Sequence, residues 1–370
     1  MAALIRSRLT DWTTLVPLIA ILILAACWGR ELPAAVIAVV AALLAGAVLA
    51  AVHHAEVVAH KVGEPFGSLL LAVAVTVIEV GLIVTLMISG GEKTQSLARD
   101  TVFAAVMITC NGIFGLSLLI GALRRRVAVF NPEGTGGALA TVATLATLSL
   151  VVPTFTTSRP GPQFSPAQLT FAAVASLALY GLFVLVQTGR HRDYFLPVTQ
   201  EGSVLAVDAD GDGHADPPAA RTAWASLALL IVALVAVVGN AKLVSPAIES
   251  GVSAANLPQA FVGVIIALLV LLPETLAASR AARRDRVQIS LNLALGSAMA
   301  SIGLTIPAIA LASIWLEGPL VLGLGGTQLT LLALTAVTGV LTVVPGRATV
   351  LQGGVHLVLL AAFVFLAASP

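Results

Sequence analysis

Charged residues are scarce in this sequence. Asp, Glu, Lys and Arg make up only 10% of its 370 residues, and the formal net charge is +1. Soluble globular domains carry about 25% charged residues, so a water-soluble domain of ordinary composition is excluded. Aromatic residues are also few, at 5%. With neither a basic stripe nor an aromatic platform, the chain is not expected to bind nucleic acid.

Cysteine and deeply placed histidine are scarce too. Cys27 and Cys110 both lie in apolar runs, so we expect them to pack as small hydrophobic residues and not to form a disulfide or a metal site. His356 is the one histidine deep in an apolar run, and no nucleophile–base pair or metal-ligand pair accompanies it. This pattern disfavours an enzyme and gives no reason to expect a cofactor.

Long apolar runs make up most of the chain. Hydrophobic residues reach 58%, and the mean hydropathy is +1.03. A membrane-spanning helix needs about 20 apolar residues. Eleven segments qualify, centred on residues 14–29, 33–53, 66–90, 100–122, 136–153, 167–188, 222–244, 257–279, 287–313, 319–344 and 349–369. The predicted fold class is therefore an all-α polytopic membrane protein of about eleven transmembrane helices.

Lys and Arg residues predict the orientation of these spans. Fourteen of the nineteen lie at the N-terminus or in the loops on its side of the membrane, and five lie on the other side. Because Lys and Arg are retained on the cytoplasmic side, we expect the N-terminus in the cytoplasm and the C-terminus outside. The first segment also resembles a cleaved lipoprotein signal ending at Cys27. We expect an uncleaved helix, because the next span begins six residues later.

The longest polar stretch divides the remaining spans into two equal sets. Residues 1–32 hold an extra N-terminal transmembrane helix, and residues 33–188 a first set of five helices. Residues 189–221 form an acidic cytoplasmic linker, and residues 222–370 hold a second set of five. Five is odd, so the two sets cross the membrane in opposite senses. This is the inverted-repeat architecture of many secondary transporters.

One glutamate occupies a matching place in each repeat. Aligning Glu79 with Glu274 is accompanied, in the following helix, by the pairing of Asn111 with Ser297. An acid inside the bilayer is costly, so it suggests a function. The alternative for Glu274 is a helix-end glutamate at the water interface, but a carboxylate repeated in an inverted half favours a shared role.

The two glutamates differ in expected depth. At about 1.5 Å per residue, Glu79 lies roughly 20 Å from a helix start at Phe66. Glu274 lies only about 9 Å from Arg280 on the same measure, which is shallow for a transmembrane site. We therefore expect the helix to be broken at Pro273.

A polar loop between the second and third spans is a second candidate site. It holds three histidines and two glutamates, among them Glu56, His60 and Glu64. Such a loop suits a proton or cation entrance, because imidazole titrates near physiological pH. A solvated loop at the membrane interface is the favoured interpretation.

The linker contains an incomplete calcium-binding loop. Asp208, Asp210, Asp212 and Asp216 take positions 1, 3, 5 and 9 of such a loop, with a glycine at position 6. The usual acid at position 12 is missing, since Ala219 stands there. A regulatory Ca²⁺ site and a flexible acidic linker both remain open.

Longer motifs carry a family resemblance. They are Gly63-Glu-Pro-Phe-Gly67, Val75-Thr-Val-Ile-Glu79, Arg99-Asp-Thr-Val-Phe-Ala-Ala-Val-Met107, Leu272-Pro-Glu-Thr275 and Ser290-Leu-Asn-Leu-Ala-Leu-Gly-Ser-Ala298. In these the chain resembles the calcium/cation antiporter superfamily and, within it, the bacterial ChaA-type calcium/proton antiporters. The resemblance implies exchange of Ca²⁺, as substrate, for H⁺ across a bacterial-type cytoplasmic (inner) membrane. It also implies that the two repeat glutamates bind the cation and protons in turn.

Neutral ligands must join the two carboxylates, because Ca²⁺ takes six to eight oxygens. Backbone carbonyls freed at a helix break can supply some of them. The candidate side chains on neighbouring helices are Asn111, Asn292, Ser297 and Ser301. For each of them, hydrogen bonding between helices is an equal alternative.

Two other transport classes need comparison. A Na⁺ or K⁺/H⁺ antiporter of the same fold is the closest alternative, since a monovalent ion needs fewer negative charges. A channel is disfavoured, because no filter loop or charged ring is present. The sequence leaves the oligomeric state open.

Overall fold

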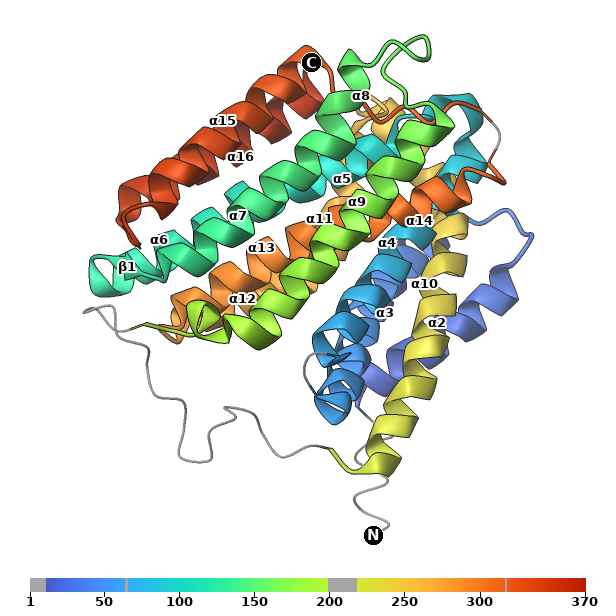
Figure 1. The fold of residues 1–370 in the computed structure, drawn as a ribbon. Helices are drawn as coiled ribbons and strands as arrows, with labels where there is room; N and C mark the ends of the chain where they lie inside the picture. Colours follow the sequence, from blue (N-terminus) through green and yellow to red (C-terminus); the bar gives the residue numbers. More distant parts are fainter. Residues whose placement is uncertain (1–10, 64–65, 199–217, 317) are drawn as a thin grey trace. The chain divides into compact units, whose positions relative to one another are not determined.

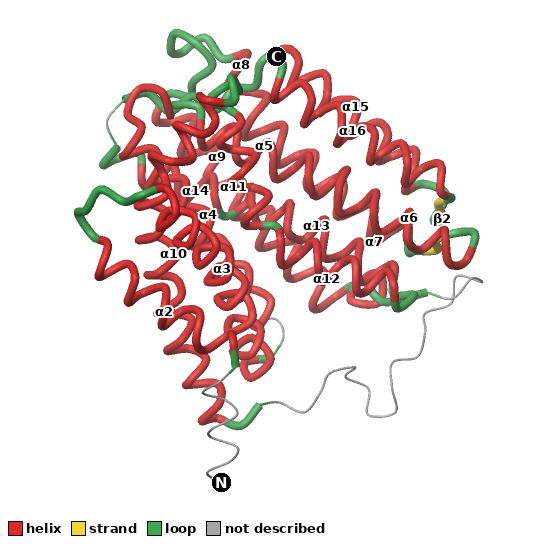
Figure 2. The backbone as a smooth tube through the Cα atoms, turned by 180° about the vertical axis from the view of Figure 1, so that it is seen from behind, coloured by secondary structure: helices red, strands yellow, loops and turns green. Residues whose placement is uncertain are grey.

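The computed structural model describes residues 11–63, 66–198, 218–316 and 318–370. Within these ranges the chain is almost entirely helical (Figures 1 and 2), and its regular strands form one short antiparallel pair. The chain divides into two compact units. The first unit is Met1–Thr94 with His214–Val262, and the second unit is Gln95–Gly213 with Gly263–Pro370.

Each unit is assembled from helices of both halves of the chain. The first unit contains α2 (Trp12–Cys27), α3 (Ala34–Val62), α4 (Phe66–Gly90), η1 (Gly91–Thr94) and α10 (Ala220–Ala254). The first half of the second unit contains α5 (Leu97–Met107), η2 (Ile108–Ile113), α6 (Phe114–Arg125), β1 (Ala128–Val129), α7 (Pro132–Ala146), η3 (Thr147–Val151), α8 (Val152–Phe155), α9 (Pro166–Leu185), η4 (Val186–Arg190) and η5 (Arg192–Phe195). The rest contains α11 (Phe261–Val270, which begins at the end of the first unit), α12 (Leu272–Arg283), α13 (Val287–Gly303), α14 (Thr305–Ala312), α15 (Gly326–Val343), β2 (Arg347–Ala348) and α16 (Val350–Ala368).

These helices confirm the predicted fold class. Among the described residues, nine helical stretches are long and apolar enough to cross a membrane, and the bent pair α11 and α12 makes a tenth if it is one span. The helix α2, with 16 residues, is shorter. Each of the eleven predicted segments coincides with one of these stretches. The chain is an all-α, multi-pass membrane protein.

Two long helices form the centre of the packing within the first unit. The helix α3 has 29 residues and α10 has 35, and they pack along each other with α2 and α4 beside them. Small residues allow α4 and α2 to approach α10 closely: a Cβ at Gly81 of α4 would lie 2.6 Å from Val238 Cγ2, and one at Gly239 of α10 would lie 2.2 Å from Leu24 Cδ2. Glycines at helix contacts are a common device in membranes, where van der Waals packing drives association.

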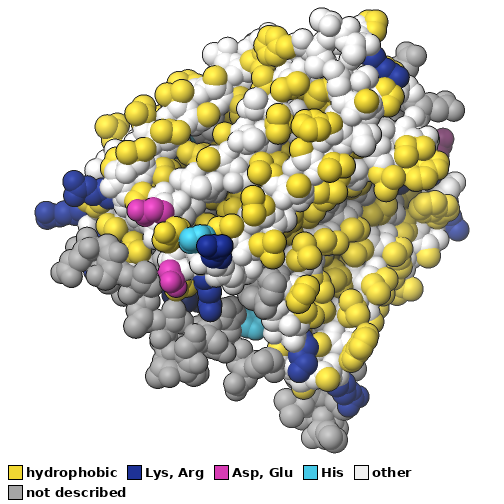
Figure 3. Space-filling view, viewed as in Figure 1, with side chains coloured by type: hydrophobic (Ala, Val, Ile, Leu, Met, Phe, Trp, Pro, Cys, Tyr) yellow, Lys and Arg dark blue, Asp and Glu magenta, His cyan; other side chains and the backbone are white. Residues whose placement is uncertain are grey.

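The surface of the protein suits contact with lipid. Figure 3 shows hydrophobic side chains over most of the viewed face. Large apolar side chains are exposed along many helices, including Leu341 at 70% and Val358 at 68% exposure. In water such a surface would be an aggregation hazard, whereas in a bilayer it faces acyl chains.

Reciprocal packing within the second unit supports the predicted repeat. The last helix of the first set, α9, packs on α13 and α14, while the last helix of the second set, α16, packs on η2 and α6. Likewise α7 packs on α13, and α15 packs on η2. Both α9 and α16 begin with a capping box, built from Ser165 with Gln168 and from Thr349 with Gln352. Two halves related by a pseudo-twofold axis are expected to exchange contacts in this manner.

Loops of the second unit that are predicted to lie on the same side of the membrane contact each other. The strand pair β1–β2 joins the loop after α6 to the loop after α15, and Arg125 forms an ion pair with Asp285 of the α12–α13 loop at 2.6 Å. The sequence predicts all three loops on one side of the membrane. The loops carrying Gln163 and Val321, predicted on the other side, bridge each other. Which side is cytoplasmic stays a prediction.

One boundary differs from the prediction. The residues from His53 to Val62 were expected to be a loop, but they are the last part of α3. Polar side chains there do not end the helix, because a helix can continue beyond the hydrocarbon region with its backbone hydrogen bonds intact.

Candidate functional site

Glu79 lies deep in a helix of the first unit. Its side chain is 2% exposed, and it stands near the middle of α4, about 20 Å from the helix start and about 17 Å from its end by helical rise. The flanking residue Ile78 is buried as well. This position does not fit a carboxylate at the water interface. A buried acid in a membrane helix indicates a function.

Glu274 lies just after a break between two helices. As predicted, the span is interrupted next to Pro273: α11 ends at Val270, α12 begins at Leu272, and the two axes differ by 54°. Proline has no N–H, so it cannot serve the carbonyl of Leu269 one turn earlier. The neighbouring carbonyl of Leu271 accepts from the Thr275 amide at 2.9 Å and from its hydroxyl at 2.7 Å.

The break also changes the electrostatic surroundings of Glu274. It places this half-buried carboxylate in the first turn of α12. The N-terminal end of a helix carries a partial positive charge, which favours an acid, while the arginines of α12 lie in its last turn, where they suit the opposite end. Glu274 thus stands where carbonyls and a carboxylate occur together, as a hard cation requires.

Asn111 lies in a π-helical segment of the second unit. It is fully buried in η2, where Nδ2 donates to Thr335 Oγ1 at 2.9 Å and Oδ1 bonds His356 Nδ1 at 3.1 Å. Single π turns inside α-helices occur frequently at functional sites. The amide of Asn111 is therefore engaged by α15 and α16, which is the interhelical alternative that the sequence left open.

Asn292 is engaged as well. It is half-buried in α13, donates from Nδ2 to the Phe195 carbonyl at 2.6 Å and accepts from Gln288 Nε2 at 2.8 Å. Ser297 is half-buried and Ser301 is buried, at 3% exposure, on the same helix. All four candidate neutral ligands belong to the second unit together with Glu274, whereas Glu79 belongs to the first.

Several buried polar residues join helices of the second unit without having been predicted as site residues. Ser117 of α6 bonds Ser290 of α13, which in turn donates to the Ala278 carbonyl of α12 at 2.7 Å. Gln288 is 1% exposed. Their signal was present, since each is a polar residue inside an apolar segment, but a single polar residue does not reveal its partner on a distant helix.

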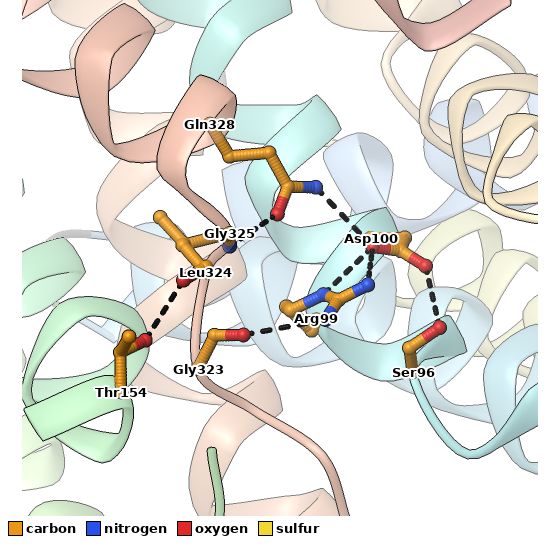
Figure 4. Close-up of polar contacts among 8 residues, drawn as sticks. All are labelled: Ser96, Arg99, Asp100, Thr154, Gly323, Leu324, Gly325 and Gln328. Carbon is orange, nitrogen blue, oxygen red and sulfur yellow. Dashed lines mark hydrogen bonds and ion pairs between the residues drawn. The ribbon is translucent and has the colours of Figure 1, made fainter. Parts of the chain in front are cut away.

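A second polar cluster of the second unit gathers around Asp100. Figure 4 shows Arg99 bonded to Asp100 and to the Gly323 carbonyl, while Ser96 and Gln328 also reach Asp100. The Arg99–Asp100 ion pair measures 2.8 Å. A cavity of about 520 Å³ lies beside it, lined by Arg99, Arg159 and several threonines. Asp100 balances the charge of Arg99, so Arg159 leaves the lining net positive, which disfavours a cation in this cavity.

The remaining candidate residues lie in the last part of α3 or outside the described ranges. Glu56 and His60 lie near the end of α3, and both are exposed. Glu64 lies outside the described residues, as do Asp208, Asp210, Asp212 and Asp216 of the calcium-loop motif. The entrance and the regulatory site therefore stay predictions.

The chain is similar to a known family of membrane proteins over nearly its full length. The family model for sodium/calcium exchanger protein matches residues 32–189 and 225–368, which leaves out the polar linker between them. A protein of Sinorhizobium fredii (strain NBRC 101917 / NGR234), y4hA, whose name describes only an ionic transporter, is 46% identical over 97% of this chain and 96% of its own. The sodium-potassium/proton antiporter ChaA of Escherichia coli (strain K12) is 33% identical over 97% of this chain and 96% of its own. A Ca²⁺/H⁺ antiporter of Aphanothece halophytica is 24% identical over 71% of this chain and 70% of its own.

Solved structures agree on the fold. The structure of native YfkE has a TM-score of 0.69 and 16% identity, covering 96% of this chain and 98% of that one. The H⁺/Ca²⁺ exchanger CAX has a TM-score of 0.63 and 16% identity, covering 96% and 91%. The helical order, the repeat glutamates and these matches lead to one conclusion: the chain belongs to the sodium/calcium exchanger protein family, within the calcium/cation antiporter superfamily.

Proposed function

We propose that this protein exchanges Ca²⁺ for H⁺ across the membrane by alternating access, with Glu79 and Glu274 shared by the cation and the protons. The observation that carries the proposal is a carboxylate at a matching place in each repeat. Glu79 is buried in α4, and Glu274 lies in the first turn of α12, directly after the helix break. A carboxylate without a function in either place would only destabilise the protein in the membrane. Two acids can neutralise one divalent cation.

Oxygen chemistry at the break fits a calcium ion. Ca²⁺ takes six to eight oxygens in flexible geometry, including carboxylates and backbone carbonyls. The carbonyl of Leu269 has no donor from Pro273, and it lies one turn before Glu274 in the same bent span. The hydroxyls of Ser297 and Ser301 on α13, which packs on α12, are the neutral side chains best suited to complete the set. Asn111 and Asn292 contribute by holding helices, since their amides already bond protein.

Protons and the cation compete for the same carboxylates. When the cation leaves, two ionised carboxylates in apolar surroundings would repel each other and lose solvation. Binding of protons removes this free-energy cost. If only the neutralised site moves between the two sides, competition alone gives antiport. Charge balance suggests two protons for one Ca²⁺. We expect this exchange in a bacterial-type cytoplasmic membrane, with the N-terminus in the cytoplasm.

Exchange of Na⁺ or K⁺ for H⁺ is a second candidate. The Escherichia coli relative is named as a sodium-potassium/proton antiporter, and it matches nearly the full chain. The relative named as a Ca²⁺/H⁺ antiporter is more distant and matches 71% of the chain. A monovalent ion would leave a net negative charge at two ionised carboxylates, so it would favour retention of one proton.

Ion competition separates the two candidates. The purified wild type is reconstituted into liposomes, a pH gradient is imposed, and uptake of Ca²⁺ is followed with increasing Na⁺ or K⁺ on the same side. Our proposal expects gradient-dependent Ca²⁺ uptake that millimolar Na⁺ or K⁺ does not abolish. Proton-coupled Na⁺ or K⁺ transport without Ca²⁺ transport would select the second candidate, and uptake that ignores the pH gradient would reject antiport.

A further inference from the structure

A chain of buried hydrogen bonds runs from α15 through α16 to the π-helical segment η2. His356 of α16 is 1% exposed, and Nδ1 bonds Asn111 Oδ1 at 3.1 Å while Nε2 bonds Thr342 Oγ1 at 3.2 Å. Asn111 passes the chain on, because Nδ2 donates to Thr335 Oγ1 at 2.9 Å. The proposed exchange mechanism gives this histidine no task.

The donors and acceptors of this chain fit a neutral imidazole. An amide oxygen only accepts, so Nδ1 of His356 must carry the hydrogen that goes to Asn111. Nε2 then accepts from the hydroxyl of Thr342. At the other end, the hydroxyl of Thr335 accepts from Asn111 and lies 3.6 Å from Met107 Sδ, to which it donates. Every donor from Thr342 to Met107 thus has an acceptor, and Asn111 Nδ2, which carries two hydrogens, also lies 3.8 Å from Met107 Sδ. The chain fixes the Asn111 amide in one orientation.

Packing holds the ring in place. A Cβ at Gly115 of α6 would lie 2.7 Å from the Cβ of His356, so α16 reaches this distance only because Gly115 has no side chain. The Phe114 ring meets the imidazole edge to face, with centroids 5.1 Å apart. The histidine is therefore positioned by α6 on one side and by α15 on the other.

Through Asn111 the chain reaches the helices of the proposed site. The segment η2 contacts α12, which carries Glu274, and α13, which carries Ser297 and Ser301. We infer that His356 is a positioning residue for cation exchange: its Nδ1–H holds Asn111 and so keeps η2 in place against α12 and α13, which sets the affinity for the cation. This inference rests on the proposed function for its effect on transport, but not for its effect on η2.

Two substitutions of His356 separate its two hydrogen bonds. Asparagine places an amide nitrogen near the position of Nδ1, so His356→Asn keeps the bond to Asn111 and loses the bond to Thr342. Glutamine places its amide near Nε2, so His356→Gln does the reverse. Leaving a buried amide oxygen without a donor is costly. We therefore expect His356→Gln to raise the KM for Ca²⁺ by about tenfold, with a smaller change in the maximal rate, while His356→Asn stays within about twofold of wild type.

A matched control and a second readout complete the test. Thr330→Val removes an exposed hydroxyl of α15 that bonds its own helix, at the Gly326 carbonyl, and it should leave KM unchanged. Amide hydrogen exchange over residues 108–113 should be faster in His356→Gln than in wild type or His356→Asn.

The outcomes that overturn the inference are distinct from failure of the proposed function. If His356→Asn raises KM as much as His356→Gln does, the ring has another role, such as carrying protons. If neither variant changes KM, the affinity claim is wrong. If the wild type does not exchange cations for protons, the proposed function fails, and hydrogen exchange still decides the role of His356 in holding η2. Equal exchange rates in all variants would reject that role.

Discussion

His54 of α3 donates its Nε2 hydrogen to the carbonyl oxygen of Thr13 in α2, at a distance of 2.9 Å. That carbonyl is the one that Pro17 leaves without a helical donor, because proline has no N–H to offer four residues later. The buried histidine thus compensates for a proline in a neighbouring membrane helix, and it ties α2 to α3.

This relationship predicts a coupled pair of substitutions. His54→Leu leaves the Thr13 carbonyl without its donor, and we expect a loss of about 1–2 kcal/mol in stability. In the background of Pro17→Ala, residue 17 supplies the missing N–H, so the same His54→Leu change should cost less. Thermal unfolding of the four proteins in detergent measures this cycle. Equal costs in both backgrounds would show that the proline and the histidine are independent.

The helix break at Pro273 predicts a kinetic effect. Pro273→Ala supplies an N–H to the Leu269 carbonyl and lets α11 and α12 approach one straight helix. The proposed site then loses an oxygen ligand, and we expect the KM for Ca²⁺ to rise by about tenfold. Initial rates in liposomes measure this, with Pro17→Ala as a control proline in α2. Unchanged kinetics in Pro273→Ala would mean that the break does not serve cation binding.

Much of the fold follows from hydropathy, because a long helix in lipid has to be apolar over most of its length. The break next to Pro273 was also predictable, since proline chemistry is local. The π-helical segment Ile108–Ile113 was not, because a π turn has no residue signature of its own. The partnership of Asn111 with His356 was equally hidden, since 245 positions separate them in sequence and only helix packing brings them together. Residues 53–62 were predicted as a loop because they are polar, but polar residues are also common in a helix that continues beyond the hydrocarbon region.

Loop grouping predicts the outcome of labelling from each side. In a background with Cys27→Ser and Cys110→Ala, single cysteines replace Asp285, Arg347 or Arg159, which are all exposed. An impermeant maleimide should reach positions 285 and 347 from the cytoplasmic side, and position 159 from outside. Inverted and right-side-out vesicles provide the two sides. Labelling of positions 285 and 159 from the same side would contradict the span alternation. Labelling of every position from the side opposite to the expected one would contradict only the predicted orientation.

The aspartate loop predicts a regulatory effect only. Deletion of residues 208–216 should leave proton-coupled Ca²⁺ exchange within about twofold of wild type, because both repeat glutamates lie outside it, and should alter only how the rate responds to cytoplasmic Ca²⁺. A length-matched Gly/Ser replacement controls for the loss of linker length. Complete loss of exchange would mean that these aspartates belong to the transport path.

The central claim is that one carboxylate from each repeat binds the cation and the protons. Glu79→Gln and Glu274→Gln keep the side-chain size but remove the charge, and Glu133→Gln, at an exposed position of α7, is the matched control. The most direct measurement is the initial rate of Ca²⁺ uptake into liposomes under an imposed pH gradient. Our account expects each of the two repeat variants to lose uptake by at least about a hundredfold, while Glu133→Gln retains wild-type rates. Proton-driven uptake at the wild-type rate in either Glu79→Gln or Glu274→Gln would contradict the two-carboxylate mechanism.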